Sequence, residues 1–170
     1  QRSPLFACMH RESHYFEGQR YLLKLNVDPK NKNSVVLKKT IMQLQLKAEY
    51  DTQKRKEILE SWLRAKLRSR LIPFIEKWEN QLGVKAKECK IKKMKTKWGS
   101  CNQEVMRVWF NLELSKVDDY ALDYVVMHEL AHLKIRNHGK QFIQILNKNM
   151  SDWEQRKAQL NETILEFNNA

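Results

Sequence analysis

The sequence predicts an α+β fold with strands first, then one long helix, then more strands and further helices. Roughly the first fifty positions contain β-favouring runs, some with alternating apolar and polar residues, and apolar residues then recur at three- and four-residue steps up to Gly83, after which alternation returns. Because 170 residues suffice for one hydrophobic core, we predict a single domain, residues 1–170. It would comprise N-terminal strands at 1–50, a long helix at 52–82 and a third part at 84–170.

The N-terminal part favours extended structure. Glu17 and Gly18 lie between two β-favouring runs, as in a hairpin turn. From residue 23 to 27 apolar and polar residues alternate, which is typical of a half-buried strand. After a loop at 28–34, the runs VVLKK and IMQLQLK predict two more strands. We therefore expect a small antiparallel sheet, packed on the long helix.

The long helix is predicted from an amphipathic pattern. Pro73 predicts a kink or a division within it, and Gly83 predicts its end. The polar face carries a basic stripe, for which a solvated surface is the commoner role than a binding surface. The apolar positions are Ile58, Trp62, Leu63, Leu67, Leu71, Ile75, Trp78 and Leu82.

Two strands joined near residue 102, followed by three helices, are predicted within residues 84–170. In the second strand Val108 and Phe110 would be buried, which presents the alternate residues on the opposite face. Asp118 or Asp119 would cap the next helix, and a short helix and a final helix would follow it.

The helix after this cap carries the pattern His-Glu-x-x-His. His128 and His132 are four residues apart, so their side chains lie on one face about 6 Å apart along the axis and can share one ion. Glu129 projects beside them, where a carboxylate takes a proton from a metal-bound water. We therefore predict one catalytic Zn²⁺ per chain, with another divalent metal as the alternative, and residues 84–170 as the catalytic part.

A catalytic zinc ion takes three protein ligands and leaves one position open. His138 is the leading third candidate, at the metzincin spacing from His128, although Ile135 stands where that motif has glycine. His138 points the wrong way unless the helix breaks, and we expect left-handed backbone at Asn137 or Gly139 to build the turn. The rival ligands are carboxylates of a later helix, namely Asp152, Glu154 and Glu162.

Four sequence blocks resemble the YgjP-like family of bacterial metal-dependent hydrolases. They are MKTKWGSCN, VWFNLELSK, YVVMHELAHLKIRNHGKQF and DWEQRKAQLN, in this order. The family is similar to zincin metallopeptidases of the SprT-like and minimal gluzincin groups. The resemblance implies a zincin-like α+β fold with a small sheet above an active-site helix, a catalytic Glu129, and metal binding by His128, His132 and His138. Because family members typically carry a further N-terminal stretch, we expect a truncated or variant form here.

The resemblance implies two activities, of which the first is that of a metallopeptidase. An extended peptide would add to an exposed strand edge, and we expect that edge to be the strand at 105–112. Zinc would polarise the scissile carbonyl. The residues proposed as oxyanion donors are Tyr124, Arg136 and Asn137.

The second activity is that of a nucleoside triphosphate pyrophosphatase that acts on UTP. Clustered cations would then hold the phosphates, and Trp98 or Trp109 would stack on the base, although core packing is the commoner role of tryptophan. The candidate residues are Lys93, Lys95, Lys97 and Arg107, with Asn111 on the same strand face as Arg107. A nucleic-acid-associated protease or binding module is a third hypothesis, for which the sequence offers no base-reading motif.

The composition restricts the partners and the location. A formal charge of +12 predicts attraction to nucleic acid, nucleotides or acidic peptides without choosing among them, and a solvated surface is the alternative. Cys8, Cys89 and Cys101 form no Cys-x-x-Cys pair, which indicates a reducing cytoplasm rather than a disulfide framework. There is neither a membrane-spanning run nor a signal peptide core, so no membrane partner is expected. The oligomeric state is not predicted.

Four further polar residues show sequence patterns that indicate a function less strongly than the His-Glu-x-x-His pattern does. His10 and His14 share the four-residue spacing but lie in a segment without helical periodicity, so we expect neither to bind metal. Cys101 has no triad partner, which favours a structural thiol over a nucleophile. Ser100 and Cys101 would either shape the turn beside the metal or touch substrate.

Overall fold

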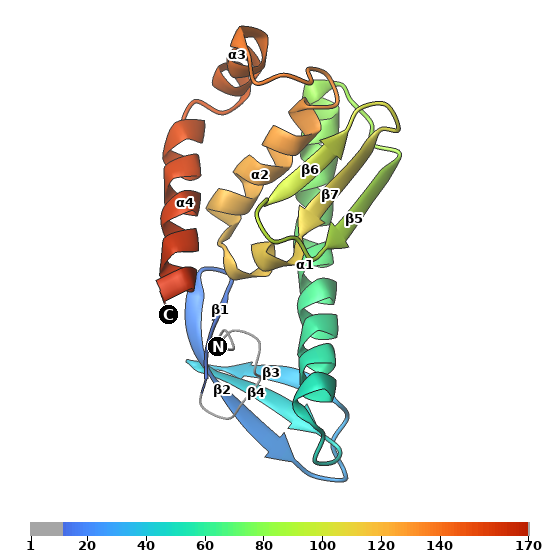
Figure 1. Ribbon diagram of the computed structural model, residues 1–170, viewed down its shortest axis with the longest axis vertical. Coiled ribbons are helices and arrows are strands. Elements are labelled where there is room, and N and C mark those ends of the chain that lie inside the picture. Colours follow the sequence, from blue (N-terminus) through green and yellow to red (C-terminus); the bar gives the residue numbers. More distant parts are fainter. Residues whose placement is uncertain (1–11, 170) are drawn as a thin grey trace.

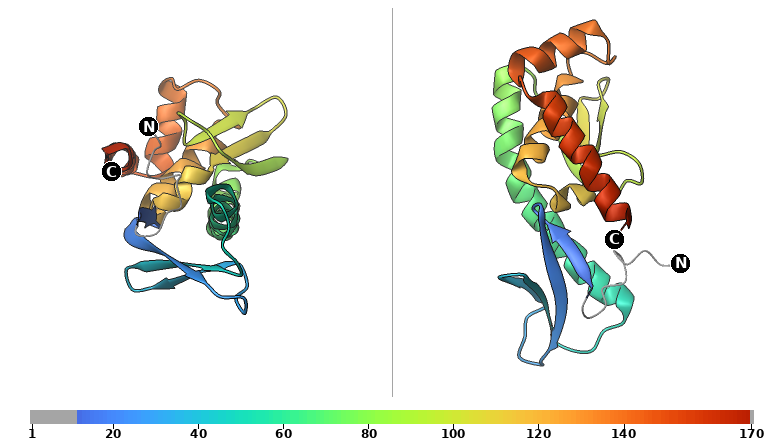
Figure 2. Two further views of the ribbon diagram at one scale, coloured as in Figure 1. Left: turned by 60° about the horizontal axis from the view of Figure 1, so that its bottom comes forward. Right: turned by 90° about the vertical axis from the view of Figure 1, so that its left-hand side faces the viewer.

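Figure 1 shows the computed structural model, which describes residues 12–169. Its described part is an α+β fold with one sheet beside each half of a long helix, α1 (Thr52–Leu82). The other helices are α2 (Asp119–Ala131), α3 (Lys140–Asn149) and α4 (Trp153–Asn169). In both Figures 1 and 2, α2 lies between α1 and α4. None of the described helices is long and apolar enough to cross a membrane.

The N-terminal sheet is mixed, not antiparallel as the sequence predicted. Its strands are β1 (Ser13–Phe16), β2 (Gln19–Val27), β3 (Ser34–Lys38) and β4 (Ile41–Leu46), arranged in the order β1-β2-β4-β3. The predicted hairpin turn at Glu17 and Gly18 is confirmed, with both residues at positive φ. The loop after β2 carries β3 to the far edge, so β4 returns between them and runs parallel to β2.

Helix α1 has the predicted bounds. Asp51 caps its first turn by accepting a hydrogen bond from the Lys54 backbone, and Gly83 ends it with a left-handed φ of 67°. Pro73 lies inside the helix but does not divide it. Pro73 removes one backbone donor, and packing along both halves of the helix keeps the remaining turns in place.

The described residues form two hydrophobic clusters instead of the one core that we expected. The first lies under the N-terminal sheet and includes Leu23, Leu44 and Leu59. The second lies among α1, α2, the second sheet and α4, and includes Leu67 and Phe110. Leu59 and Leu67 are both on α1, so this helix joins the two clusters. The single domain over 1–170 remains a prediction.

The second sheet has three strands where the sequence predicted two. They are β5 (Glu88–Lys92), β6 (Gly99–Asn102) and β7 (Arg107–Asn111), in the order β5-β7-β6. The segment between β5 and β6 is a loop, because the buried Asn111 amide donates to the carbonyls of Met94 and Lys97 and holds it there. Strand β7 is paired on both sides, so the predicted free edge at 105–112 is wrong, and β6 is an edge strand instead.

Candidate metal centre

Helix α2 presents one polar face to a pocket. The Asp118 side chain caps the helix by accepting from the Ala121 backbone at 3.0 Å, which confirms the predicted start. Leu122, Val126 and Leu130 are fully buried and fix the rotation of the helix about its axis. This rotation leaves the histidines of the motif facing the pocket.

Three imidazoles converge at the end of α2. The Nε2 atom of His132 lies 3.3 Å from that of His128 and 3.0 Å from that of His138, and the third separation is 3.4 Å. Nitrogen ligands at the usual Zn–N length in a tetrahedral site are about 3.3 Å apart, so the trio fits a zinc ion. Among the described residues this is the group of three or more donors that could hold a metal.

The chain leaves the helix at His132, which caps it. The predicted break is therefore present, and it brings His138 back to the other two histidines. The expected left-handed turn is absent, since neither Asn137 nor Gly139 has a positive φ. The turns that follow α2 are made with right-handed and extended backbone instead.

Each of the two helix histidines has a fixed ring orientation. The Nδ1 atom of His132 lies 3.0 Å from the carbonyl oxygen of Ile135, which requires Nδ1–H and leaves Nε2 free to bind a cation. The Nδ1 atom of His128 lies 3.3 Å from the Tyr124 hydroxyl. Burial, with smaller effects of the neighbouring histidines and of Lys157, lowers the pKa of His128 to about 3, so its imidazole is neutral at pH 7.

Phe142 packs its ring against the imidazole rings of all three histidines. It is fully buried, and its ring stacks on that of His132 at 4.3 Å between centroids with an interplanar angle of 12°. The rings of His128 and His138 meet its edge at 5.1 and 5.2 Å. This apolar contact restricts the motion of the imidazole rings, and the phenyl ring offers no donor atom that would compete with them for a cation.

Glu129 is buried beside this group, with 8% of its surface exposed. Burial raises the pKa of its carboxyl to about 7, against the opposing charge of Lys97. Gly99 of β6 packs directly on it, because a Cβ atom at Gly99 would stand 2.7 Å from Glu129 Cγ. Only glycine leaves room there, so strand β6 packs directly against the Glu129 side chain.

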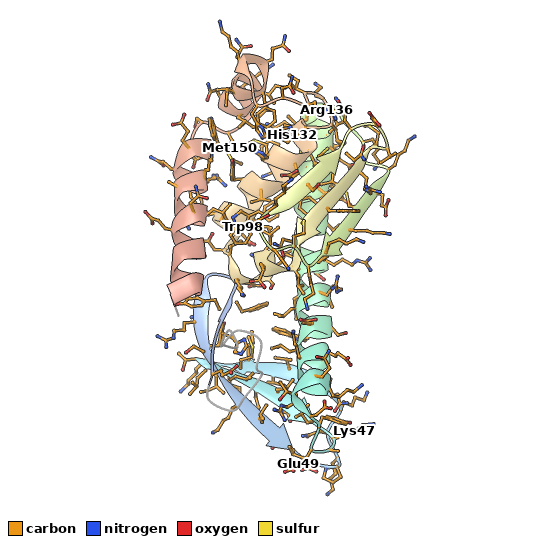
Figure 3. The ribbon with its side chains drawn as sticks, viewed as in Figure 1. Lys47, Glu49, Trp98, His132, Arg136 and Met150 are labelled. Carbon is orange, nitrogen blue, oxygen red and sulfur yellow. The ribbon has the colours of Figure 1, made fainter. Side chains whose placement is uncertain are left out.

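The pocket above these residues has a volume of about 630 Å³. Figure 3 shows His132 and Arg136 towards the α3 end of α2, and Trp98 farther along the helix. Strand β6 forms one wall and α4 contributes to the other. The lining includes the predicted residues Lys97, Trp98, Ser100, Cys101, Arg107, Tyr124, His128, Glu129, His132, Arg136 and His138.

Five residues predicted to face substrate do not line this pocket, namely Lys93, Lys95, Trp109, Asn111 and Asn137. Lys93 instead pairs with Glu60 at 2.7 Å. The cations of Arg107 and Lys92 lie over the Trp109 ring, at 4.3 and 4.7 Å from its centroid. Asn111 is buried and its amide holds the loop before β6, which is a structural role.

The rival carboxylates lie elsewhere. Asp152 accepts hydrogen bonds from the Tyr120 hydroxyl and from Arg156, and neither Glu154 nor Glu162 belongs to the donor group. His14 is also apart from that group, whereas His10 and Cys8 lie outside the described residues.

Several residues at the site were not predicted from the sequence. Phe142 was not singled out, and Gly99 carried no signal beyond its place in the Trp-Gly-Ser-Cys block. Lys157, Leu160 and Asn161 of α4 line the pocket although they are far from the motif in sequence. Their signal in the sequence was their place in the block DWEQRKAQLN, which did not assign them to the site, because α4 packing brings them there.

Comparison with known proteins extends this description. The model of a family described as YgjP-like, metallopeptidase domain, matches residues 2–163. The zymogen of the metallopeptidase jannalysin from Methanocaldococcus jannaschii is similar in fold, with 22% identity, a TM-score of 0.51, and coverage of 55% of this chain and 89% of that one. The abylysin zymogen from Pyrococcus abyssi gives 16% identity, a TM-score of 0.50, and coverage of 55% and 93%. No curated protein sequence matches the chain.

Proposed function

The chain belongs to the YgjP-like metallopeptidase family, and from this membership we propose that it hydrolyses peptide bonds with one zinc ion held by His128, His132 and His138. The observation that carries the proposal is the convergence of three Nε2 atoms, 3.0 to 3.4 Å apart, at the wall of an open pocket. Three imidazole nitrogen donors beside an open volume are the arrangement of a catalytic zinc site.

Glu129 is proposed as the general base. When bound, zinc supplies a lowered pKa for a water ligand and polarisation of the scissile carbonyl. Glu129 takes the proton from the attacking water and then delivers it to the amide nitrogen, so that the C–N bond breaks and a neutral amine leaves. A pKa near 7 suits a group that must first accept and then donate a proton at neutral pH.

The substrate is proposed to lie along β6. This strand pairs with β7 on one side, and its residues Gly99 to Asn102 line the pocket. An extended peptide that adds to this edge would have its backbone fixed beside Glu129, which Gly99 contacts. Tyr124 and Arg136 line the same pocket and are the candidate oxyanion donors.

A nucleotide pyrophosphatase is the second candidate. One observation favours it, namely that Lys97, Arg107 and Arg136 line the pocket and would suit phosphate oxygens. In this case the same water would attack phosphorus and pyrophosphate would leave.

One experiment tests both functions. Zinc-loaded protein is incubated with unstructured casein and, separately, with UTP, and the products are followed by mass spectrometry and by pyrophosphate release. We expect casein cleavage that falls at least about a thousandfold in Glu129→Gln. Glu154→Gln is the matched control, because Glu154 is an exposed carboxylate outside the pocket. Pyrophosphate release without peptide cleavage would replace the peptidase assignment with the second candidate.

A further inference from the structure

The pocket carries cationic side chains that are not neutralised. Four cations line it, and none of them forms an ion pair within the part of the chain that the structure describes. They come from four different segments and are Lys97, Arg107, Arg136 and Lys157. The carboxylates that line the pocket are Glu129, which is proposed as the base, and Glu104. An excess of positive charge therefore surrounds the reacting position.

Several acidic groups form ion pairs away from the pocket. Asp119 pairs with Arg70, Asp123 with Lys77 and Arg156, and Glu60 with Lys93, all away from the pocket. Basic residues in those places are thus compensated, whereas the four pocket cations form no ion pair among the described residues, and Arg107 lies over the Trp109 ring. A bound zinc ion would add two further positive charges, and its three imidazole ligands would not cancel them because imidazole binds zinc in its neutral form.

The cations stand on several sides of the reacting position. Lys97 lies two residues before β6 and its charge acts on Glu129, whereas Lys157 on α4 acts on His128 from the opposite wall. Arg136 follows α2, at the end where Gln103 of the β6–β7 turn donates to the carbonyls of Leu133 and Lys134. A peptide along β6 would therefore have cations near both of its ends.

We propose that this pocket selects peptides that carry carboxylates close to the scissile bond, either as acidic side chains or as the C-terminal carboxylate. This inference rests on the proposed peptidase function and names its substrate class. Carboxylate and guanidinium or ammonium groups form charge-assisted hydrogen bonds, and several cations around one pocket add their attraction at long range. A basic peptide would be repelled by the same field.

The test compares peptides that differ in charge alone. One cleavable sequence is prepared with Glu, Gln or Lys on each side of the cleavage site, and every version is made with a free and with an amidated C-terminus. We expect kcat/KM to be at least about fivefold higher for Glu than for Gln, and lowest for Lys. The ratio should fall when sodium chloride is raised from about 50 to 500 mM, because salt screens exposed charges. The amidated set shows whether side chains or the terminus supply the carboxylate.

Substitutions of three pocket cations test which side chains cause the selectivity for acidic peptides. Lys97→Gln, Arg136→Gln and Lys157→Gln should each reduce the Glu-to-Gln ratio, and Arg136→Glu should favour the Lys peptide. Lys24→Gln, on an exposed position of β2, is the matched control and should leave the ratio unchanged. Equal rates for Glu, Gln and Lys peptides would overturn the proposed selectivity while the peptidase function stands. Failure to cleave any peptide, with zinc bound, would instead overturn the peptidase function and with it this inference.

Discussion

The two halves of the molecule use buried histidine in different ways. In the N-terminal half, burial and the charge of Lys116 lower the pKa of His14 to about 4, and its Nε2 lies 3.5 Å from Glu12. In the C-terminal half, burial lowers the pKa of His128 to about 3, but two further imidazoles meet it beside an open pocket. Burial and a shifted pKa are thus common to both places. The convergence of several donors on accessible space distinguishes the candidate metal centre.

Removal of one ligand tests this difference most strongly. His132→Ala should abolish stoichiometric zinc binding and lower hydrolysis by at least about a thousandfold, because two donors remain of three. Zinc content is measured by inductively coupled plasma mass spectrometry after gel filtration. His14→Gln is the matched control and should retain one zinc per chain. Full zinc content in His132→Ala would show that the ion binds elsewhere.

The next largest effect concerns the two hydrophobic clusters. Leu59 and Leu67 are both buried on α1, one in each cluster, and truncation of either to alanine should cost about 2 to 5 kcal/mol of the free energy of unfolding. Regional hydrogen exchange would follow each half. We expect Leu59→Ala to weaken protection of the N-terminal strands and Leu67→Ala that of α2. Equal loss in both halves from either variant would mean that the two clusters unfold as one unit.

Low pH should lower the free energy of unfolding, because His14 is buried in its neutral form. The folded pKa of about 4 lies below the ordinary value of 6.5, so the unfolded chain binds a proton first as the pH falls. The stability contributed by neutral His14 is present above pH 6.5 and is lost between pH 6.5 and 4, for a total of about 3 kcal/mol. The free energy of unfolding, measured by urea titration at several pH values, should change less with pH in His14→Gln than in the unchanged chain. An identical pH dependence would mean that His14 is not protonated on unfolding.

The smallest expected effect concerns Gly99. Gly99→Ala should lower kcat about tenfold, since the new Cβ would meet Glu129 Cγ at 2.7 Å and displace the carboxylate. Zinc content should not change, because the histidines are not touched. Gly139→Ala is the matched control, since a Cβ there meets nothing within 4 Å.

A double-mutant cycle separates positioning from general damage. The loss of stability caused by Gly99→Ala should shrink when Glu129 is also alanine, because the nearest clashing atoms are then gone. An equal loss in both backgrounds would assign the effect to the strand and not to the carboxylate.

Local patterns in the sequence predicted what depends on neighbours along the chain. The four-residue spacing placed His128 and His132 on one helix face, Gly83 ended α1, and the Asp118 cap began α2. Each of these depends on backbone geometry within a few residues, where periodicity and capping chemistry are decisive.

Tertiary structure decided what depends on distant pairing. Strand alternation reads the same in a central and in an edge strand, so the sequence assigned the free edge to the β7 region, and packing made β6 the edge. The same limit explains the unexpected split into two clusters and the arrival of Lys157 at the pocket. These features follow from contacts between segments far apart in sequence, whose energies no local pattern encodes.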